Sequence, residues 1–209
     1  MTTILKKTST QARGRLRRQQ LIEATRNLLA EHELDSITLA DVATAAGASK
    51  GSAYHSYANI AELYMDVVST IGQELHSAVA APITDEVQDW RDVFLLCLRR
   101  GTQLLSADPA GRQLIHGPKS PPAIKRSDRA NDHQVAEVIL AHITQLFDFT
   151  PDATTVERIY YAIELADVLY CLSVQQHDEI IPSMAEEGER AALAYLALYL
   201  PEQISRRHK

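Results

Sequence analysis

The stretch that decides the fold class is Thr38-Leu-Ala-Asp-Val-Ala-Thr-Ala-Ala-Gly47-Ala-Ser-Lys-Gly-Ser-Ala-Tyr54-His-Ser-Tyr57. Thr38 and Asp41 have the spacing of a helix N-cap with a partial capping box. Gly47 supplies the left-handed residue that ends a first short helix, and Ser49 caps a second one. Two short helices joined by a tight, glycine-containing turn form a helix-turn-helix unit, which lays its second helix in the major groove of DNA. An ordinary helical hairpin is the alternative interpretation.

The sequence around this unit resembles the DNA-binding domain of TetR-family transcriptional regulators. Four pieces within residues 17–63 carry the resemblance: a long first helix over 18–31, the segments 38–47 and 48–57, and a further helix that Asn59 opens. The resemblance implies a DNA-binding head on a helical body that binds a ligand. Beyond about residue 70 it is a resemblance of architecture only.

Four residues depart from the pattern of this family. Tyr57 stands where Phe is usual, Ala53 where a bulkier apolar residue is usual, and Glu33 where Gly is common. Ile60 stands where the family often places a Lys that touches a phosphate. Without that Lys, we expect affinity for DNA to depend more on the N-terminal arm.

The whole sequence predicts an all-α protein, because helical periodicity is widespread and strand signals are scarce. We expect the first 60 residues (1–60) to form a three-helix, helix-turn-helix DNA-binding domain with a basic N-terminal arm. A long helix joins it to a helical effector-binding and dimerisation domain (61–209). Besides the two short helices, we expect helices near 11–31, 59–80, 85–107, 108–117, after Pro122, 152–177 and from Pro182 to Leu200. Their starts are marked by Asn59, Thr84 and Asp108-Pro109.

The net charge of −6 is divided unevenly along the chain. Residues 1–60 carry eight Lys and Arg against five Asp and Glu, whereas residues 61–209 carry thirteen against 22. Attraction to phosphate is local and is screened within about 10 Å, so a basic head on an acidic body suits a DNA-binding protein. We expect the arm, with Arg13, Arg15 and Arg17, to be disordered without DNA and to contact its backbone or minor groove. A solubilising tail is the alternative.

The second short helix holds most of the candidate DNA-binding side chains. Lys50, Ser49 and Ser52 can donate hydrogen bonds to phosphates or base edges, and Gly51 permits a close approach of the backbone. Thr38, at a helix N-terminus, can present backbone N–H groups to a phosphate. The resemblance implies that Tyr54 and Tyr57 contact phosphate or support the helix and that His55 faces DNA. The helix offers no Arg, Asn or Gln for bidentate base recognition, so thymine methyl groups, the arm and DNA shape are expected to set sequence preference.

The last two predicted helices, near 152–177 and 183–200, indicate a homodimer. The first has two apolar stripes, which need two partners, and residues 191–200 are apolar on all sides. An isologous contact of these helices with their counterparts would bury both surfaces. The alternative is that both helices lie in the core of a monomer.

Polar and aromatic residues within otherwise apolar helices are the candidates to line a small-molecule site in the body. These are Trp90, Arg100, Gln103, His116, Tyr160, Glu164, Asp167 and Tyr170, with His116 and Tyr170 preferred. For any one of them, a core or surface position is the simpler interpretation.

The sequence favours a ligand-responsive regulator, most simply a repressor that binds a palindromic operator as a homodimer and is released by an unidentified effector. We expect no enzyme activity, cofactor or metal, because phosphate-loop, His-Glu-x-x-His and G-x-S-x-G motifs are absent from the sequence. A cytoplasmic protein without membrane contact is expected, since no apolar run of 18 residues occurs. Two alternatives stay open: a constitutive DNA-binding regulator without effector, and a helical ligand carrier or enzyme with a vestigial head.

Overall fold

The computed structural model of the chain describes residues 2–84 and 86–207. Its regular elements are helical, apart from one isolated antiparallel bridge between Phe147 and Arg206, which confirms the all-α prediction. In chain order the described elements are α1 (Thr2–Glu31), η1 (Leu34–Ser36), α2 (Leu39–Ala45), α3 (Lys50–Ser56), α4 (Ile60–Ala80), α5 (Trp90–Ala107), α6 (Pro109–Gly111), η2 (Arg112–His116), α7 (Pro122–Leu146), α8 (Thr155–His177) and α9 (Pro182–Leu196).

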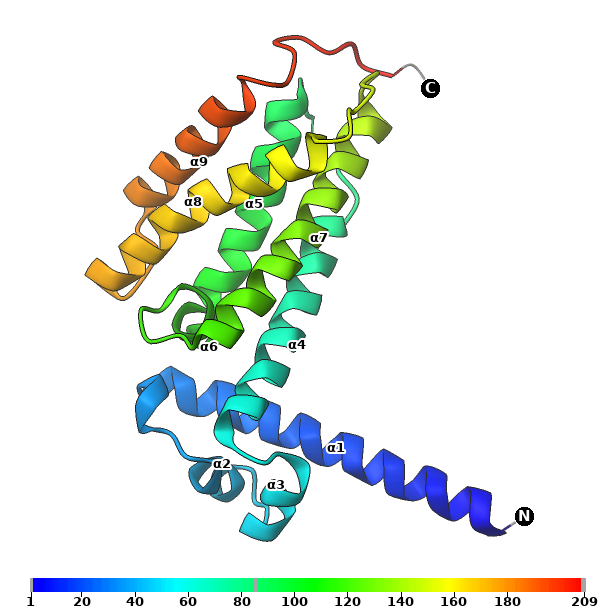
Figure 1. Ribbon diagram of the computed structural model, residues 1–209, viewed down its shortest axis with the longest axis vertical. Coiled ribbons are helices and arrows are strands. Elements are labelled where there is room, and N and C mark those ends of the chain that lie inside the picture. The colour runs from blue at the N-terminus through cyan, green and yellow to red at the C-terminus, as the bar shows by residue number, and fades with distance from the viewer. Residues whose placement is uncertain (1, 85, 208–209) are drawn as a thin grey trace.

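Figure 1 shows a small head at one end of the molecule and a taller helical body at the other. The head consists of α1, α2 and α3, and the body contains α5 to α9. Helix α4 rises from the head into the body, where it packs against α5 and α7. Helices α8 and α9 lie side by side along one side of the body.

Helix α4 also joins the two apolar cores of the molecule. Its N-terminal part, from Leu63 to Ile71, packs into the core of the head. Its second half contributes Leu75 and Val79 to the core of the body. The core of the head also takes in Leu114 and other residues near α6, so apolar packing is continuous from head to body.

Local capping explains where several helices begin. The Oδ1 atom of Asn59 accepts from the backbone N–H of Glu62 at 3.0 Å, as the sequence predicts for the start of α4. Asp108 caps α6, with Pro109 as the first helical residue. Gly117 follows the last residue of η2, so the short helical segment ends where the sequence predicts.

The N-terminal arm differs from expectation, because α1 begins at Thr2 and not near residue 11. The arm is therefore a continuation of the first helix, whereas its basic composition predicts disorder. The physical reason lies in the rest of that composition: residues 1–31 contain no Pro, and Gly14 is their one Gly, so nothing interrupts helical backbone.

Two other helix limits also differ from expectation. Helix α5 begins at Trp90, because Asp89 accepts from the N–H groups of its first turn and forms a complete capping box with Asp92. The expected start near residue 85 is not seen, and residue 85 itself lies outside the described residues. Helix α9 ends at Leu196, before the expected Leu200. Pro201 disfavours helical backbone at the residue that precedes it, which is Leu200.

Candidate nucleic-acid interface and a buried acidic cluster

The turn between α2 and α3 has the geometry that its sequence predicts. The Oγ1 atom of Thr38 accepts from the N–H of Asp41 at 3.3 Å, and the N–H of Thr38 donates to Asp41 Oδ2 at 2.9 Å. These bonds to Thr38 hold the pKa of Asp41 below its ordinary value. Gly47 has φ +61°, and the N–H of Ala48 donates to the carbonyl oxygen of Ala43 at 2.8 Å, which completes a Schellman motif. The helix-turn-helix unit is thus fixed by local bonds.

Helix α3 presents one polar face to solvent. Ser49 caps it by accepting from the N–H of Ser52, and Ala53 anchors its opposite face in the core of the head. The side chain of Tyr54 is 54% exposed, although a large aromatic ring usually packs inside. The other candidates on this helix are also accessible: Thr38, Ser49, Lys50, Gly51 and His55 are exposed, and Ser52 is half-buried. A cation, hydroxyl groups and an aromatic ring therefore lie together on one surface.

Tyr57 departs from this pattern, because it is only 3% exposed. Its hydroxyl donates to Oδ2 of Asp66 at 2.8 Å, and the guanidinium of Arg18 lies over its ring, 4.9 Å from the centroid. Burial, and then the hydrogen bond to Asp66, raise the pKa of Tyr57 above its ordinary value. Of the two roles considered for Tyr57, the structure favours support of the recognition helix over contact with phosphate. Direct contact of Tyr57 with DNA stays a prediction.

The basic residues of the arm lie on the N-terminal half of α1, which projects past α3 in Figure 1. Arg13 and Arg15 are exposed and Arg17 is half-buried. A projecting helix holds these cations at fixed spacings of 1.5 Å per residue along its axis. The structure therefore carries the basic side chains of the arm on a rod and not on a flexible tail.

Side chains of Arg26 and Gln113 fasten the head to the body, as do the ion pairs of Lys119 with Glu33 and Asp35. Arg26 of α1 donates to Glu74 of α4 at 2.7 Å and to Asp108, the cap of α6, at 2.8 Å. The Glu74 hydrogen bond is the main cause that raises the pKa of Arg26 above its ordinary value. Gln113 of η2 donates to the carbonyl oxygens of Leu29 and His32, and these bonds satisfy carbonyls at the end of α1.

Five of the eight sequence-predicted residues of the body lie on η2 and on the faces of α8 that meet η2 and α7. His116 has a fully buried side chain, and its Nε2 atom lies 2.8 Å from Oδ1 of Asp167. The ring of Tyr170 meets the imidazole edge-on at 6.0 Å, and burial raises the pKa of Tyr170 to about 12. Glu164 lies one turn before Asp167 and accepts from Arg129 at 3.2 Å. Burial and the nearby Glu164 raise the pKa of Tyr160 to about 12.

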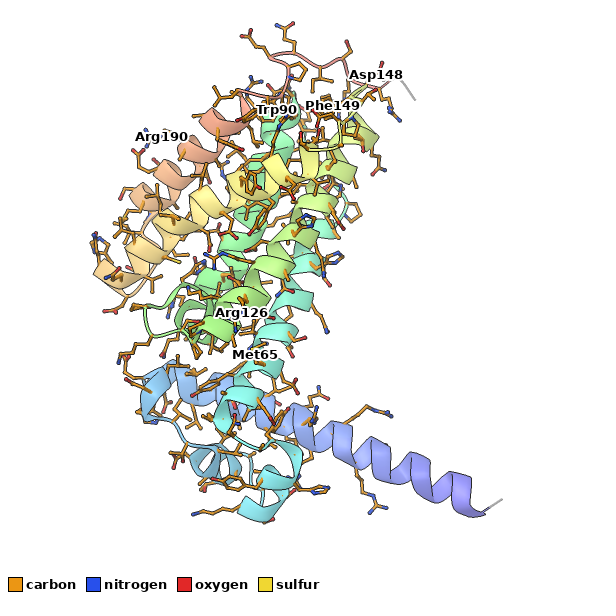
Figure 2. All side chains as sticks on the ribbon, in the orientation of Figure 1. Met65, Trp90, Arg126, Asp148, Phe149 and Arg190 are labelled. Atoms are coloured by element: carbon orange, nitrogen blue, oxygen red, sulfur yellow. The ribbon has the colours of Figure 1, made fainter. Side chains whose placement is uncertain are left out.

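The other three predicted residues lie elsewhere. Trp90 is fully buried at the end of the body farthest from the head, and its Nε1–H donates to the carbonyl oxygen of Pro201 (Figure 2). Arg100 donates to the carbonyl oxygens of Ala81 and Pro82, just after α4. Gln103 is exposed on α5. These three side chains therefore do not belong to the group of residues around His116.

Two members of this group, Asp128 and Asp132 of α7, were not predicted from the sequence. They are 5% and 8% exposed. Burial raises the pKa of Asp128 to about 7, and burial followed by the charge of Asp128 raises the pKa of Asp132 well above its ordinary value. The signal that would have found them is their register: the spacing Ile124, Asp128, Asp132 continues the stripe that α7 buries.

Two spaces adjoin the acidic cluster, which consists of Asp128, Asp132, Glu164 and Asp167. An inner cavity of about 40 Å³ lies among α4, α5, α7 and α8, and it is apolar except near Asp132, Asp167, Thr102 and Tyr170. An outer hollow of about 520 Å³ opens between α7 and α8, where Asp128, Asp167, Val168 and Leu172 line it. Asp167 therefore borders both the small, largely apolar space and the larger one.

Helix α8 also carries an apolar stripe with no cover. Its large exposed side chains recur at the spacing of one helix face: Tyr161, Leu165, Val168 and Leu172. Leu198 and Tyr199, directly after α9, are exposed as well.

Within the described part of the chain, no group of three or more His, Cys, Asp and Glu has a metal-binding arrangement. None of its helices is long and apolar enough to cross a membrane.

The exposed recognition helix on a capped turn defines a DNA-binding protein of the helix-turn-helix class, and comparison with known proteins gives its family. Residues 21–67 match the bacterial regulatory proteins of the tetR family, and residues 88–200, more than half of the chain, match the tetracyclin repressor-like C-terminal domain. The chain belongs to the TetR family of transcriptional regulators, which are generally non-enzymatic DNA-binding proteins.

Solved structures share the fold at low sequence identity. A TetR-family regulator from Streptomyces coelicolor is 20% identical, with a TM-score of 0.70 over 88% of this chain and 99% of its own. A TetR regulator from Rhodococcus sp. RHA1 is 20% identical, with a TM-score of 0.65 over 89% and 98%. SmeT, the repressor of the Stenotrophomonas maltophilia multidrug efflux pump SmeDEF, is 16% identical, with a TM-score of 0.62 over 88% and 91%. Among curated proteins, none matches the sequence.

Proposed function

We propose that the protein is a ligand-responsive repressor that binds a palindromic operator as a homodimer and releases it when a small molecule enters the body. The observation that carries the DNA-binding part is the exposed face of α3, with Lys50 and Tyr54, on a turn fixed by its own caps. A regulator of chromosomal DNA in a bacterium acts in the cytoplasm.

Recognition of DNA in this proposal combines a helix and an arm. Lys50, Ser49 and His55 contact phosphates or base edges in the major groove, while Arg13 and Arg15 on the projecting α1 neutralise phosphates beside it. Phosphate contacts supply affinity in any sequence. Because α3 carries no Arg, Asn or Gln, the operator is distinguished by thymine methyl groups and by the shape of the DNA.

Dimerisation rests on the uncovered stripe of α8 and the residues after α9. Large apolar side chains such as Val168, 62% exposed, and Leu198, 73% exposed, are costly to leave in water when they form one patch. Pairing of α8 and α9 with the same helices of a second copy would cover both patches by an isologous contact. Two heads related by a twofold axis require an operator with twofold symmetry.

Control by an effector rests on the position of η2 between the acidic cluster and the head. His116, at one end of η2, contacts Asp167 of the body, and Gln113, one turn earlier, holds the end of α1. A ligand that displaces η2 therefore acts on the orientation of the head. It must bind the DNA-incompetent state more tightly, since a ligand with equal affinity for both states shifts nothing.

Selection from a random pool of duplex DNA on the purified protein tests the proposal. We expect an inverted repeat that binds about a thousandfold or more tightly than random duplex at the same salt concentration. The matched control is the Lys50→Ala, Tyr54→Ala double variant, which should enrich no sequence. Equal enrichment by this variant, or a selected sequence without symmetry, would overturn the proposal of a dimer that reads DNA through α3.

A further inference from the structure

Two largely buried carboxyl groups in the body form no hydrogen bond with a described residue, although His116 and Lys125 interact electrostatically with Asp128, and Arg129 with Asp132. Asp128 and Asp132 are more than nine-tenths buried, and no hydrogen bond or ion pair joins either of them to another described residue. Buried carboxylates are normally paired, because leaving a charge in an apolar interior is costly. The absence of a hydrogen-bond partner within this part of the protein therefore needs an explanation.

The cations nearby are already engaged. Arg129 donates to Glu164 at 3.2 Å, and Lys125 donates to the carbonyl oxygen of Ile115. His116 is held by Asp167. The four carboxylates Asp128, Asp132, Glu164 and Asp167 thus outnumber the two permanent cations: Arg129 binds Glu164, and Lys125 donates to a backbone carbonyl.

Protonation of Asp128 and Asp132 lowers the electrostatic cost of bringing these carboxyl groups together. Burial is the largest cause that raises the pKa of both Asp128 and Asp132, and the charge of Asp167 adds to it in each case. A bound cation would reverse this balance, because it stabilises the ionised carboxylates. The cluster is therefore neutralised in one of two ways, by protons or by an added positive charge.

The two spaces around the cluster are lined by both charged and apolar side chains, as a binding site for an amphipathic ligand would be. Asp132 and Asp167 border the inner cavity, whose remaining lining is largely apolar. Asp128, Glu164 and Asp167 border the outer hollow together with the cations Lys125 and Arg129, and Val168, Cys171 and Leu172 provide its apolar surface. The hollow has the volume of a small-molecule site, whereas the inner cavity holds no more than a group of the size of a water molecule.

We propose that Asp128, Asp132 and Asp167 bind the ammonium group of an organic cation whose short apolar body lies in the outer hollow. An ammonium group has three donors and no acceptor, so three carboxylates can satisfy it together. This inference rests on the proposed function and names the chemical class of its effector.

The cluster is also connected to the head. A cation that shares Asp167 competes with His116, whose Nδ1 atom has no partner of its own. His116 lies on the same short helix as Gln113, which binds the end of α1. Occupation of the cluster thus alters a contact only one helical turn away from the junction with the head.

Calorimetric titration of the full chain with butylammonium chloride tests the proposal, with 1-butanol, sodium butanoate and magnesium chloride as comparison probes at constant ionic strength. We expect butylammonium to bind about tenfold or more tightly than 1-butanol, and butanoate and magnesium not to bind. Asp132→Asn and Asp128→Asn should each weaken butylammonium binding about tenfold. Glu137→Gln removes an exposed charge from the same helix and should leave the affinity for butylammonium unchanged within about twofold.

Proton release gives a second readout that a structural role alone would not produce. The groups that face the cluster are Lys125 and Arg129 of α7, Tyr160, Glu164, Asp167, Tyr170 and Cys171 of α8, and His116 of η2. Since binding ionises Asp128 and Asp132, the affinity for butylammonium should rise with pH, and the wild type should release protons on binding. The Asp132→Asn variant should release fewer protons on binding.

The outcomes separate this inference from the proposed function. Equal binding of 1-butanol, no saturable binding of butylammonium, or unchanged binding by both Asn variants would overturn the cation site while operator binding stands. Cation binding that depends on Asp132 but leaves operator affinity unchanged at saturation would support the site and overturn effector control.

Discussion

The side-chain amide of Gln113 in η2 donates to the carbonyl oxygen of Leu29 in α1 at 2.8 Å, and its Oε1 accepts from the N–H of Leu34 at the same distance. One side chain of the body therefore completes hydrogen bonds on both sides of the bend after α1. Backbone groups of the head that would otherwise have no hydrogen-bond partner are therefore satisfied by a side chain of the body.

Replacement of Gln113 should loosen this junction. Gln113→Ala leaves the N–H of Leu34 without its acceptor, so the exchange of that amide with solvent hydrogen should become faster, and stability should fall by about 1–3 kcal/mol. Amide exchange measured by NMR and thermal unfolding would check this. Gln103→Ala, a change of the same type at an exposed position, is the control and should alter neither. Unchanged protection of Leu34 would contradict the role of Gln113.

Removal of the exposed groups of α3 should weaken binding of DNA without loss of the dimer. Lys50→Ala should lower affinity and reduce the slope of log affinity against log salt by about 1, because one phosphate is no longer neutralised. Tyr54→Ala should lower affinity with less effect on the slope. Arg126→Ala removes an exposed cation from α7 and serves as the control. Affinity equal to wild type in both α3 variants would show that another surface binds DNA.

Deletion of residues 1–16 tests the arm as a set of phosphate ligands. The deletion removes four cations, Lys6, Lys7, Arg13 and Arg15. We expect lower affinity and a smaller salt slope, by as much as about 0.9 for each phosphate that the arm neutralises. Fluorescence anisotropy of a labelled operator over a range of salt concentrations measures both. A slope that does not change would assign the arm to solubility.

The acidic cluster should make stability depend on pH. The pKa of Asp128 is raised to about 7 in the folded protein, chiefly by burial, so folding favours its protonated form. The penalty for ionisation begins above the unfolded value near 4, grows with pH and is complete above about 7. Asp128→Asn should therefore raise Tm by a few degrees at about pH 8 and by less at about pH 5. The exposed control Asp148→Asn should show no such difference, and an equal rise at both pH values for Asp128→Asn would contradict the account.

A single methyl group should disturb the contact of α8 with α9. A Cβ atom on Gly188 would lie 2.9 Å from Cε1 of Tyr170 and 3.2 Å from the carbonyl oxygen of Ala166, and the latter belongs to helix backbone that cannot turn away. Gly188→Ala should lower the free energy of unfolding by about 1–3 kcal/mol. Gly14→Ala, where nothing lies within 4 Å, should be neutral or stabilising. Denaturant unfolding of both variants is the measurement, and equal stability would contradict the close packing.

The head could be predicted in detail because its determinants are local. The capping pairs at Thr38, Ser49 and Asn59 and the left-handed Gly47 each involve residues within a few positions of one another. The same rules failed at the arm, where the basic composition indicated disorder and uninterrupted helical residues extend α1 to Thr2.

The body site could be predicted only in part, because it depends on distant segments. His116 and Asp167 meet across 51 positions of sequence, and no local pattern specifies that contact. Asp128 lies in a segment whose polar composition indicates a solvated helix start, although its position on the stripe that α7 buries indicates the opposite. Arg100 illustrates the reverse error: it is a polar residue within an apolar helix, yet it binds backbone carbonyls after α4.

The measurement that tests the central claim most directly is a hydroxyl-radical footprint of the protein on the duplex obtained by selection. Two α3 helices related by a twofold axis predict two protected segments, symmetric about the centre of the repeat. Their centres should lie about 34–36 Å apart, or a multiple of one helical turn. A single protected segment, or protection that persists with the Lys50→Ala, Tyr54→Ala double variant, would contradict recognition of DNA by a dimer through α3.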